Sequence, residues 1–308
     1  MNAVDARGSS LKGNLMIIAA TIIWGSGYAV KLAGMEFIGP ITFNAARFFI
    51  GGFVTLIPTL FYIKRQKASA QSESLPISKS TIKAGLICGA ILTLAINLQQ
   101  AGLARTTVAN ASFLTTLYVI IVPIAMLVFF KKRAPWIVWV SVIVAVTGVY
   151  FLSLSGYMQL NFGDVLIMMC AVVFAAQILV ISHFSPRHNV MVLACVQFFT
   201  VFILSTTAAF ILETPVVTDI ISAGPHVLYA GVLSSSVAYV LQMKAQKTTA
   251  PTVAAVLFSF EGVVAAAVGW VFLHQILSAR EILGCALIFV AILLAQRPQT
   301  QKSSSSRA

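Results

Sequence analysis

The sequence predicts an all-α membrane protein with ten transmembrane helices, arranged as two inverted five-helix repeats. Three observations predict this fold class: an extreme apolar composition, ten long apolar runs, and an internal repeat. Of the 308 residues, 59% are apolar and 9% are charged, whereas soluble domains carry roughly 25% charged residues. A soluble core cannot enclose so much apolar surface, and the runs lack the alternation of a barrel, so they are expected to be membrane-spanning helices.

Each apolar run is long enough for a span of roughly 17 to 20 residues. In the first repeat, expected over 14–155, the predicted helices are 14–33, 41–63, 84–104, 107–130 and 135–155. In the second repeat, expected over 163–296, they are 163–183, 190–212, 225–243, 251–273 and 280–296. Glycine, proline or basic residues separate neighbouring runs. Residues 1–13 are predicted to form a cytoplasmic tail, and the serine-rich residues 297–308 a disordered cytoplasmic tail.

The placement of the basic residues predicts which way the spans point. With the N-terminus in the cytoplasm, sixteen basic residues lie inside: Arg7, Lys12, Lys64, Arg65, Lys67, Lys79, Lys83, Lys131, Lys132, Arg133, Arg187, Lys244, Lys247, Arg297, Lys302 and Arg307. Only Lys31, Arg105 and Arg280 lie outside, and Arg47 lies within a span. This asymmetry follows the positive-inside rule. The net charge of +12 therefore reports orientation in a lipid bilayer, and no nucleic-acid partner is expected.

The internal repeat predicts the inversion. Gly13-Asn14 matches Gly163-Asp164 at a shift of 150 residues, and Val128-Phe129-Phe130 matches Val271-Phe272-Leu273 at a shift of 143. Because each repeat contains five spans, an odd number, the second copy must enter the membrane upside down. Many secondary transporters use such a pair to place a substrate site near the bilayer midplane.

Short motifs in the two halves show which proteins the sequence resembles. The motifs of the first half are Trp24-Gly25-Ser26, Tyr28, Lys31, Pro40 and Arg47-Phe48. Those of the second half are Gly163-Asp164, Ala238-Tyr239, Glu261, Gly269-Trp270, Gly284 and Leu287-Ile288. In their order and spacing these motifs resemble the EamA-domain family of the drug/metabolite transporter superfamily. The resemblance implies ten helices around a central cavity, alternating access, and export of small metabolites such as amino acids. The chain departs from the family pattern at Gly262, Phe174, Lys131 and His274, so no subfamily's substrate is carried over.

Glu261 is the most informative candidate, because an acid at a helix centre costs about 2.5 to 3.5 kcal/mol to insert. It must have a partner or a proton, so we expect it either to bind a cationic amine of the substrate or to exchange a proton during transport. The alternative is a protonated side chain bonded to a neighbouring helix. Tyr118 is its repeat partner at the shift of 143, and Trp24 lies at a similar depth.

The remaining candidates for substrate binding each have a purely structural alternative. Arg47 is placed to hold a substrate carboxylate, to snorkel to the outer interface, or to pair with a structural carbonyl, and snorkelling is favoured for Lys31. Aromatic and amide side chains that share helix faces suit a zwitterion with an apolar body, but also suit packing and interhelical hydrogen bonds. They are Trp24 with Tyr28, Asn97 with Gln100, and Tyr239 with Gln242, followed by Gln177, Thr115 and Ser259.

The sequence favours a transporter over an enzyme. None of the four histidines lies in a His-Glu-x-x-His zinc motif, no phosphate-binding loop is present, and the four cysteines are too far apart for a metal site. We therefore expect no enzymatic activity, no cofactor and no metal. The better alternative is a channel or a structural membrane protein, and trans-stimulated flux would distinguish a carrier from a channel. The predicted location is the plasma membrane, as a multi-pass protein of the bacterial inner membrane.

Overall fold

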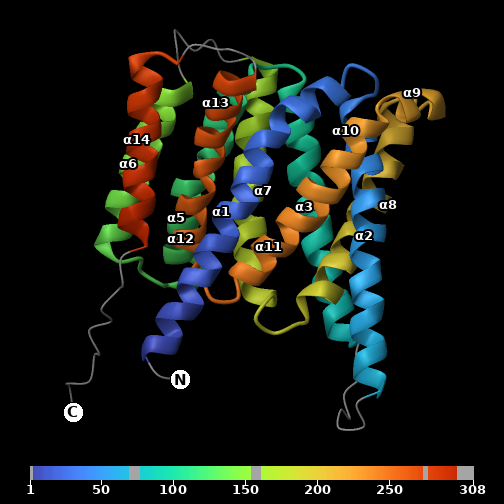
Figure 1. The fold of residues 1–308 in the computed structure, drawn as a ribbon, viewed down its shortest axis with the longest axis horizontal. Helices are drawn as coiled ribbons and strands as arrows, with labels where there is room; N and C mark the ends of the chain where they lie inside the picture. Colours follow the sequence, from blue (N-terminus) through green and yellow to red (C-terminus); the bar gives the residue numbers. More distant parts are fainter. Residues whose placement is uncertain (1–2, 69–76, 154–160, 273–276, 297–308) are drawn as a thin grey trace.

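The computed structural model is helical in the residues it describes, which are 3–68, 77–153, 161–272 and 277–296 (Figure 1). The first half contains α1 (Ala3–Gly34), α2 (Pro40–Ala68), α3 (Lys79–Leu103), α4 (Val108–Thr116), α5 (Tyr118–Phe130) and α6 (Trp136–Ser153). The second half contains α7 (Phe162–Phe184), α8 (Val190–Leu212), α9 (Val217–Ser222), α10 (Gly224–Tyr229), the π-helix η1 (Ala230–Val237), α11 (Ala238–Ala245), α12 (Pro251–Phe258), α13 (Phe260–Phe272) and α14 (Ala279–Ala295).

Eight helical segments in these described ranges are long and apolar enough to cross a membrane. Three of them are composite: α4 with α5, α10 through η1 to α11, and α12 with α13. The shorter apolar helix α6 corresponds to the fifth predicted span, and α14, of 17 residues, packs along α6 as the tenth. The predicted tail 1–13 is helical from Ala3 onward, because α1 continues through it. The predicted tail 297–308 lies outside the described residues.

The helices pack in a pattern that is unchanged when the two halves are exchanged. In the first half α3 contacts α7 and α8, and in the second half α11 contacts α1 while η1 contacts α2. Likewise α4 and α5 contact α7, and α12 and α13 contact α1. The counterparts α2 and α8 pack on each other, as do α6 and α14 at the opposite edge of the bundle (Figure 1). This is the contact pattern of two inverted repeats related by a pseudo-twofold axis.

Hydrogen bonds at the two ends of the bundle repeat the same symmetry. At the end that holds the N-terminus, Thr249 Oγ1 donates to Asn14 Oδ1 at 3.2 Å. At the other end, Thr106 Oγ1 donates to Asp164 Oδ1 at 2.5 Å. The shift of 150 relates Asn14 to Asp164, and the shift of 143 relates Thr106 to Thr249. Each bond therefore joins the start of one repeat to the other repeat, and the two bonds are symmetry counterparts.

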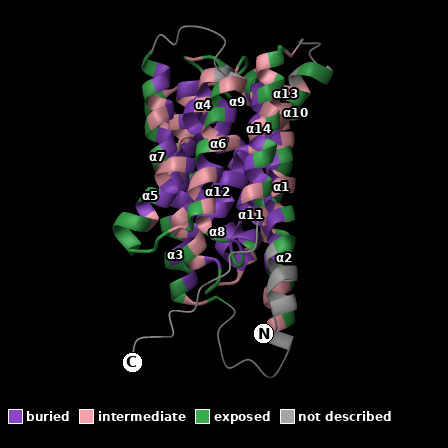
Figure 2. Cartoon of the chain, turned by 90° about the vertical axis from the view of Figure 1, so that its left-hand side faces the viewer, coloured by how far each residue is buried: buried purple, intermediate pink, exposed green. Residues whose placement is uncertain are grey.

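Large apolar side chains cover the outside of the bundle, while the buried residues lie between the helices (Figure 2). Phe61, Phe129 and Phe210 are among the exposed aromatic residues. In a soluble protein such a surface would drive aggregation, but lipid acyl chains solvate it. Trp270 is exposed, as a tryptophan that anchors a span at the membrane interface would be. Gly85 and Gly89 on α3 leave room for Val196 and Thr200 of α8, since an added Cβ would meet those side chains within 2.6 Å.

Both halves contain a helix break at the same repeat position. The α4–α5 segment is interrupted at Leu117 and the α12–α13 segment at Ser259, within one residue of coincidence under the shift of 143. At each break an amide bonds to the carbonyl three residues earlier, Leu117 to Leu114 and Ser259 to Val256. The tighter turn changes the direction in which the next residues point. Tyr118 directly follows the first break, and Glu261 lies two residues after the second.

Candidate functional site

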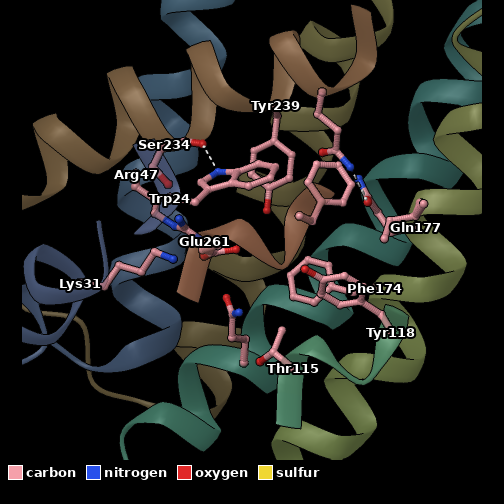
Figure 3. A pocket seen from close by; sticks show the side chains of 14 residues that line it. Trp24, Lys31, Arg47, Thr115, Tyr118, Phe174, Gln177, Ser234, Tyr239 and Glu261 are labelled. Atoms are coloured by element: carbon pink, nitrogen blue, oxygen red, sulfur yellow. Dashed lines mark hydrogen bonds between the residues drawn. The ribbon is translucent and has the colours of Figure 1, made fainter. Parts of the chain in front are cut away.

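A cavity lies in the middle of the bundle, between the two halves (Figure 3). Its first-half lining consists of Trp24, Lys31, Arg47, Gln99, Thr115 and Tyr118. Its second-half lining consists of Phe174, Gln177, Ile178, Ser234, Tyr239, Gln242, Phe258 and Glu261.

Aromatic rings form much of the cavity wall. The Trp24 ring lies 4.9 Å from the Tyr239 ring and 5.8 Å from the Phe258 ring, between centroids. The Trp24 indole is fixed by a hydrogen bond from Nε1 to the Ser234 carbonyl at 3.0 Å. Ser234 lies in the π-helix η1, a geometry that is rare and often found at functional sites. The wider turn thus helps to orient an aromatic side chain of the other half.

Arg47 lies inside the protein and lines the cavity, with only 2% of its surface exposed. Its Nε donates to Asn44 Oδ1 at 2.9 Å, and Asn44 Nδ2 donates to Asn97 Oδ1 at 2.8 Å. Asn97 Nδ2 in turn donates to Ser205 Oγ at 3.0 Å. This chain of bonds links α2, α3 and α8 and holds the guanidinium in place. Of the expectations for Arg47, the structure excludes snorkelling to the interface, and the Nε group pairs with the side-chain carbonyl of Asn44.

Lys31 also lines the cavity and is only 4% exposed, so the expectation that it snorkels was wrong. Lys31 follows Trp24 by seven residues, two helical turns, so both side chains leave α1 on the same face. That face points into the bundle, because Trp24 packs on Tyr239 of α11. The Lys31 Nζ lies 4.7 Å from the centroid of the Tyr28 ring.

Glu261 reaches the cavity from the first turn of α13. The backbone of α1 passes so close that a Cβ on Gly25 would lie 2.6 Å from the Glu261 carbonyl oxygen, which explains a glycine there. The charges of Glu261 and Lys31 act on one another, with the Tyr28 hydroxyl nearby. Within the described ranges the carboxylate has no ion pair of 4 Å or less.

Gln177 lies at the side of the cavity away from the charged residues (Figure 3), and Gln242 is its hydrogen-bond partner. Gln242 Nε2 donates to Gln177 Oε1 at 3.2 Å. The remaining amide atoms, Gln177 Nε2 and Gln242 Oε1, are buried and have no hydrogen-bond partner among the described residues. The same holds for Thr115 Oγ1 and Ser234 Oγ. Unpartnered buried polar atoms are costly, so these four atoms are available to a bound solute or to water.

The structure brings together eight of the twelve residues proposed from the sequence and leaves four outside the cavity lining. The eight are Trp24, Arg47, Thr115, Tyr118, Gln177, Tyr239, Gln242 and Glu261. Tyr28 is buried beneath Lys31, Asn97 belongs to the network behind Arg47, and Gln100 is buried with no hydrogen-bond partner among the described residues. Ser259 bonds to the Val256 carbonyl inside the helix break.

Sequence reasoning missed Gln99, Phe174, Ile178, Ser234 and Phe258, and it misplaced Lys31. The repeat offsets contained a signal for three of them. Gln99 is the counterpart of Gln242, Phe174 of Trp24, and Phe258 of Thr115. Applying the pseudo-symmetry to each candidate would therefore have found them. As for metals, no cluster of three potential ligands occurs among the residues the structure describes.

Comparison with known proteins identifies the family. The chain matches the EamA-like transporter family over residues 11–154 and 161–296. A protein of Archaeoglobus fulgidus described as an "Uncharacterized transporter" is 33% identical over 291 residues, covering 92% of this chain and 85% of that protein. A solved structure described as "Crystal structure of protein" is similar in fold, with a TM-score of 0.75 at 18% identity, covering 92% of this chain and 96% of the other. The resemblance noted in the sequence is thereby confirmed: the chain belongs to the EamA-like transporter family and is a multi-pass membrane transporter.

Proposed function

We propose that the protein exports small metabolites, such as amino acids, related solutes or drugs, by alternating access through the central cavity. The observation that carries the proposal is that both inverted halves contribute to one cavity, with charged, aromatic and amide side chains converging there. A site between two repeats becomes accessible from either side when the halves rock against each other. In this proposal residues 14–155 and 163–296 are the two functional units.

The hydrogen bonds at the two ends of the bundle suggest how the halves move. Thr249 and Asn14 join the halves at the N-terminal end, and Thr106 and Asp164 join them at the opposite end. Breaking one bond while keeping the other would open the cavity to one side only. Because the two contacts are symmetry counterparts, the pseudo-twofold axis would relate the inward-open state to the outward-open state.

The orientation that we propose places both termini in the cytoplasm of a bacterial inner membrane. In Figure 1 the start of α1 lies at the same end as the turns after α5, α7 and α11. Basic residues lie in these turns and at the adjoining end of α11: Lys131, Lys132, Arg133, Arg187, Lys244 and Lys247. Positively charged loops remain on the cytoplasmic side during insertion. Export would then carry solute away from this basic end.

We propose one of two roles for Glu261: it either binds a cationic group of the solute or exchanges a proton during the cycle. The support is its position at the repeat-related helix break, together with the absence of a direct ion pair within the described residues. Intramembrane acids commonly form proton relays or substrate sites. The remaining cavity residues would orient the solute, the rings around its apolar body and the amides at its polar end. No cofactor and no enzymatic step are part of this mechanism.

The test is transport in proteoliposomes that contain the purified protein. Labelled amino acids, nucleobases and drugs are screened for saturable flux, with and without a pH gradient. A carrier shows faster flux when unlabelled solute is loaded on the opposite side, whereas a channel, the second candidate, shows no such trans-stimulation. Saturable, trans-stimulated flux supports the proposal, and flux that rises linearly with concentration contradicts it.

The role of Glu261 is tested in the same assay with E261Q. The change keeps the side-chain volume and removes the charge, so transport should fall at least tenfold or lose its pH dependence. The matched control is E36Q, because Glu36 is exposed outside the cavity and its loss should leave flux unchanged. If E261Q matches the unmodified protein in both rate and pH profile, Glu261 has no part in the mechanism.

A further inference from the structure

We infer that the cavity selects organic anions, so that a solute with one carboxylate and no ammonium group binds more tightly than the zwitterion or the cation with the same carbon body. The inference rests on the proposed function of the cavity as the substrate site, and it narrows the class of substrate. It follows from the three charged side chains that line the cavity, Lys31, Arg47 and Glu261.

The charges of the cavity wall do not balance. Two of its fourteen lining residues are cations and one is an acid. The wall therefore carries one net positive charge when Glu261 is ionised and two when Glu261 is protonated. Uncompensated charge inside a membrane protein is costly. A bound monoanion reduces the excess, a zwitterion leaves it as it was, and a bound cation increases it.

Arg47 is the charge without a counterpart. Within the part of the chain that the structure describes, its guanidinium makes a single hydrogen bond, from Nε to Asn44, and no ion pair. An arginine side chain has five N–H donors, and the terminal four form the planar edge that binds carboxylates bidentately. Because Asn44 takes only the Nε–H, that edge is left for a ligand. The bonds from Asn44 through Asn97 to Ser205 prevent the side chain from turning away.

Lys31 adds a second positive charge on the same side of the cavity. In Figure 3 its ammonium and the Arg47 guanidinium lie on the same side as the Glu261 carboxylate. Lys31 and Glu261 influence each other electrostatically, but no ion pair of 4 Å or less joins the two residues. Because Lys31 and Glu261 offset each other's charge, the positive charge of Arg47 is the one that a bound anion would neutralise.

The uncharged part of the cavity lining indicates what the other end of the solute is like. Aromatic rings, including those of Trp24 and Tyr239, stand between the charged side and the two glutamines (Figure 3). At the glutamine side, one donor on Gln177 and one acceptor on Gln242 are unpartnered. Both groups are neutral, so they suit a hydroxyl or carbonyl group rather than a second charge. The expected solute has a carboxylate at one end and an apolar body.

The test compares solutes that share an apolar side chain and differ in the charged groups they carry: a carboxylate, both a carboxylate and an ammonium group, or an ammonium group. One set is 3-phenylpropanoate, phenylalanine and 2-phenylethylamine; the other is 4-methylpentanoate, leucine and 3-methylbutylamine. Binding to the purified full-length protein is measured by ligand-dependent thermal stabilisation. In at least one set the anion should bind at least tenfold more tightly than both counterparts, a difference of about 1.4 kcal/mol. The inference is overturned if no anion binds, or if the zwitterion or cation binds as tightly in both sets.

Variants locate the selectivity within the cavity. R47Q should reduce the preference for the anion at least tenfold while leaving the weak binding of the cation unchanged. The control is R105Q, because Arg105 is exposed and bonds to a carbonyl of its own helix. An unchanged preference in a folded R47Q protein removes Arg47 from the site and contradicts the inference. The comparison among solutes on the unmodified protein stands even if R47Q does not fold.

Measuring flux alongside binding separates this inference from the proposed function. If the anion binds preferentially but shows no trans-stimulated flux, the carrier proposal fails and the charge selectivity stands. If the zwitterions show trans-stimulated flux without any preference for the anion, the carrier stands and the charge selectivity fails.

Discussion

Replacing Thr106 or Thr249 with valine should shift the transporter in opposite directions. Valine has the shape of threonine without the hydroxyl, so T106V removes the bond to Asp164 and T249V removes the bond to Asn14. If each bond exists only while its own end of the bundle is closed, losing it favours opening at that end. T106V should therefore expose the cavity to the side opposite the N-terminus, and T249V should expose it to the N-terminal side.

The sizes of the two effects follow from the bonds. Thr106 donates to a carboxylate at 2.5 Å, and a hydrogen bond to a charged group contributes about 1.5 to 3 kcal/mol. Thr249 donates to an amide oxygen at 3.2 Å, where about 0.5 to 1.5 kcal/mol is expected. Because about 1.4 kcal/mol corresponds to a tenfold change in an equilibrium, T106V should shift the populations by tenfold or more, and T249V by about two- to tenfold.

Alkylation of a cysteine in the cavity measures these populations. The four native cysteines, Cys88, Cys170, Cys195 and Cys285, are replaced with alanine, and Q99C places a single thiol in the cavity wall. A membrane-impermeant maleimide is added from the side opposite the N-terminus. T106V should accelerate labelling and T249V should slow it. Equal rates in both variants, or a change in the same direction, would refute the idea that these bonds close opposite ends.

Two further predictions concern stability. G25V should abolish folding, seen as aggregation on size-exclusion chromatography, because even a Cβ at Gly25 would lie 2.6 Å from the Glu261 carbonyl oxygen; G27A is the control, since its nearest atom is 4.0 Å away. Burial lowers the pKa of His188, with the nearby positive charges adding to the effect, and its Nδ1 lies 3.0 Å from Thr81 Oγ1. The folded state therefore binds fewer protons than the unfolded state at His188, so its contribution to stability is present above about pH 6.5 and is lost as the pH falls below it. H188Q should reduce the fall in Tm between pH 7.5 and pH 5.5, and an identical fall would contradict this.

The sequence alone determined the fold class and the arrangement of the repeats. Long apolar runs cannot satisfy their backbone polar groups in lipid except as helices, so their number and positions follow from hydropathy. The offsets of 150 and 143 residues placed Tyr118 and Glu261 as counterparts, and both residues line the cavity. Depth along a helix is also a local property, since it depends only on residue number and helical rise.

The direction in which a side chain points across the bundle was decided by tertiary structure alone. Hydropathy does not distinguish a face toward lipid from a face toward a polar cavity, so Lys31 was placed at the interface although it lies inside. Among the amides of α3, Gln99 faces the cavity, whereas Asn97 bonds to Asn44 and Ser205. Adjacent helical residues point about 100° apart, so a small rotation of α3 decides which amide reaches the cavity. That rotation is set by the packing of α3 on α7 and α8, helices that come from the other half of the chain.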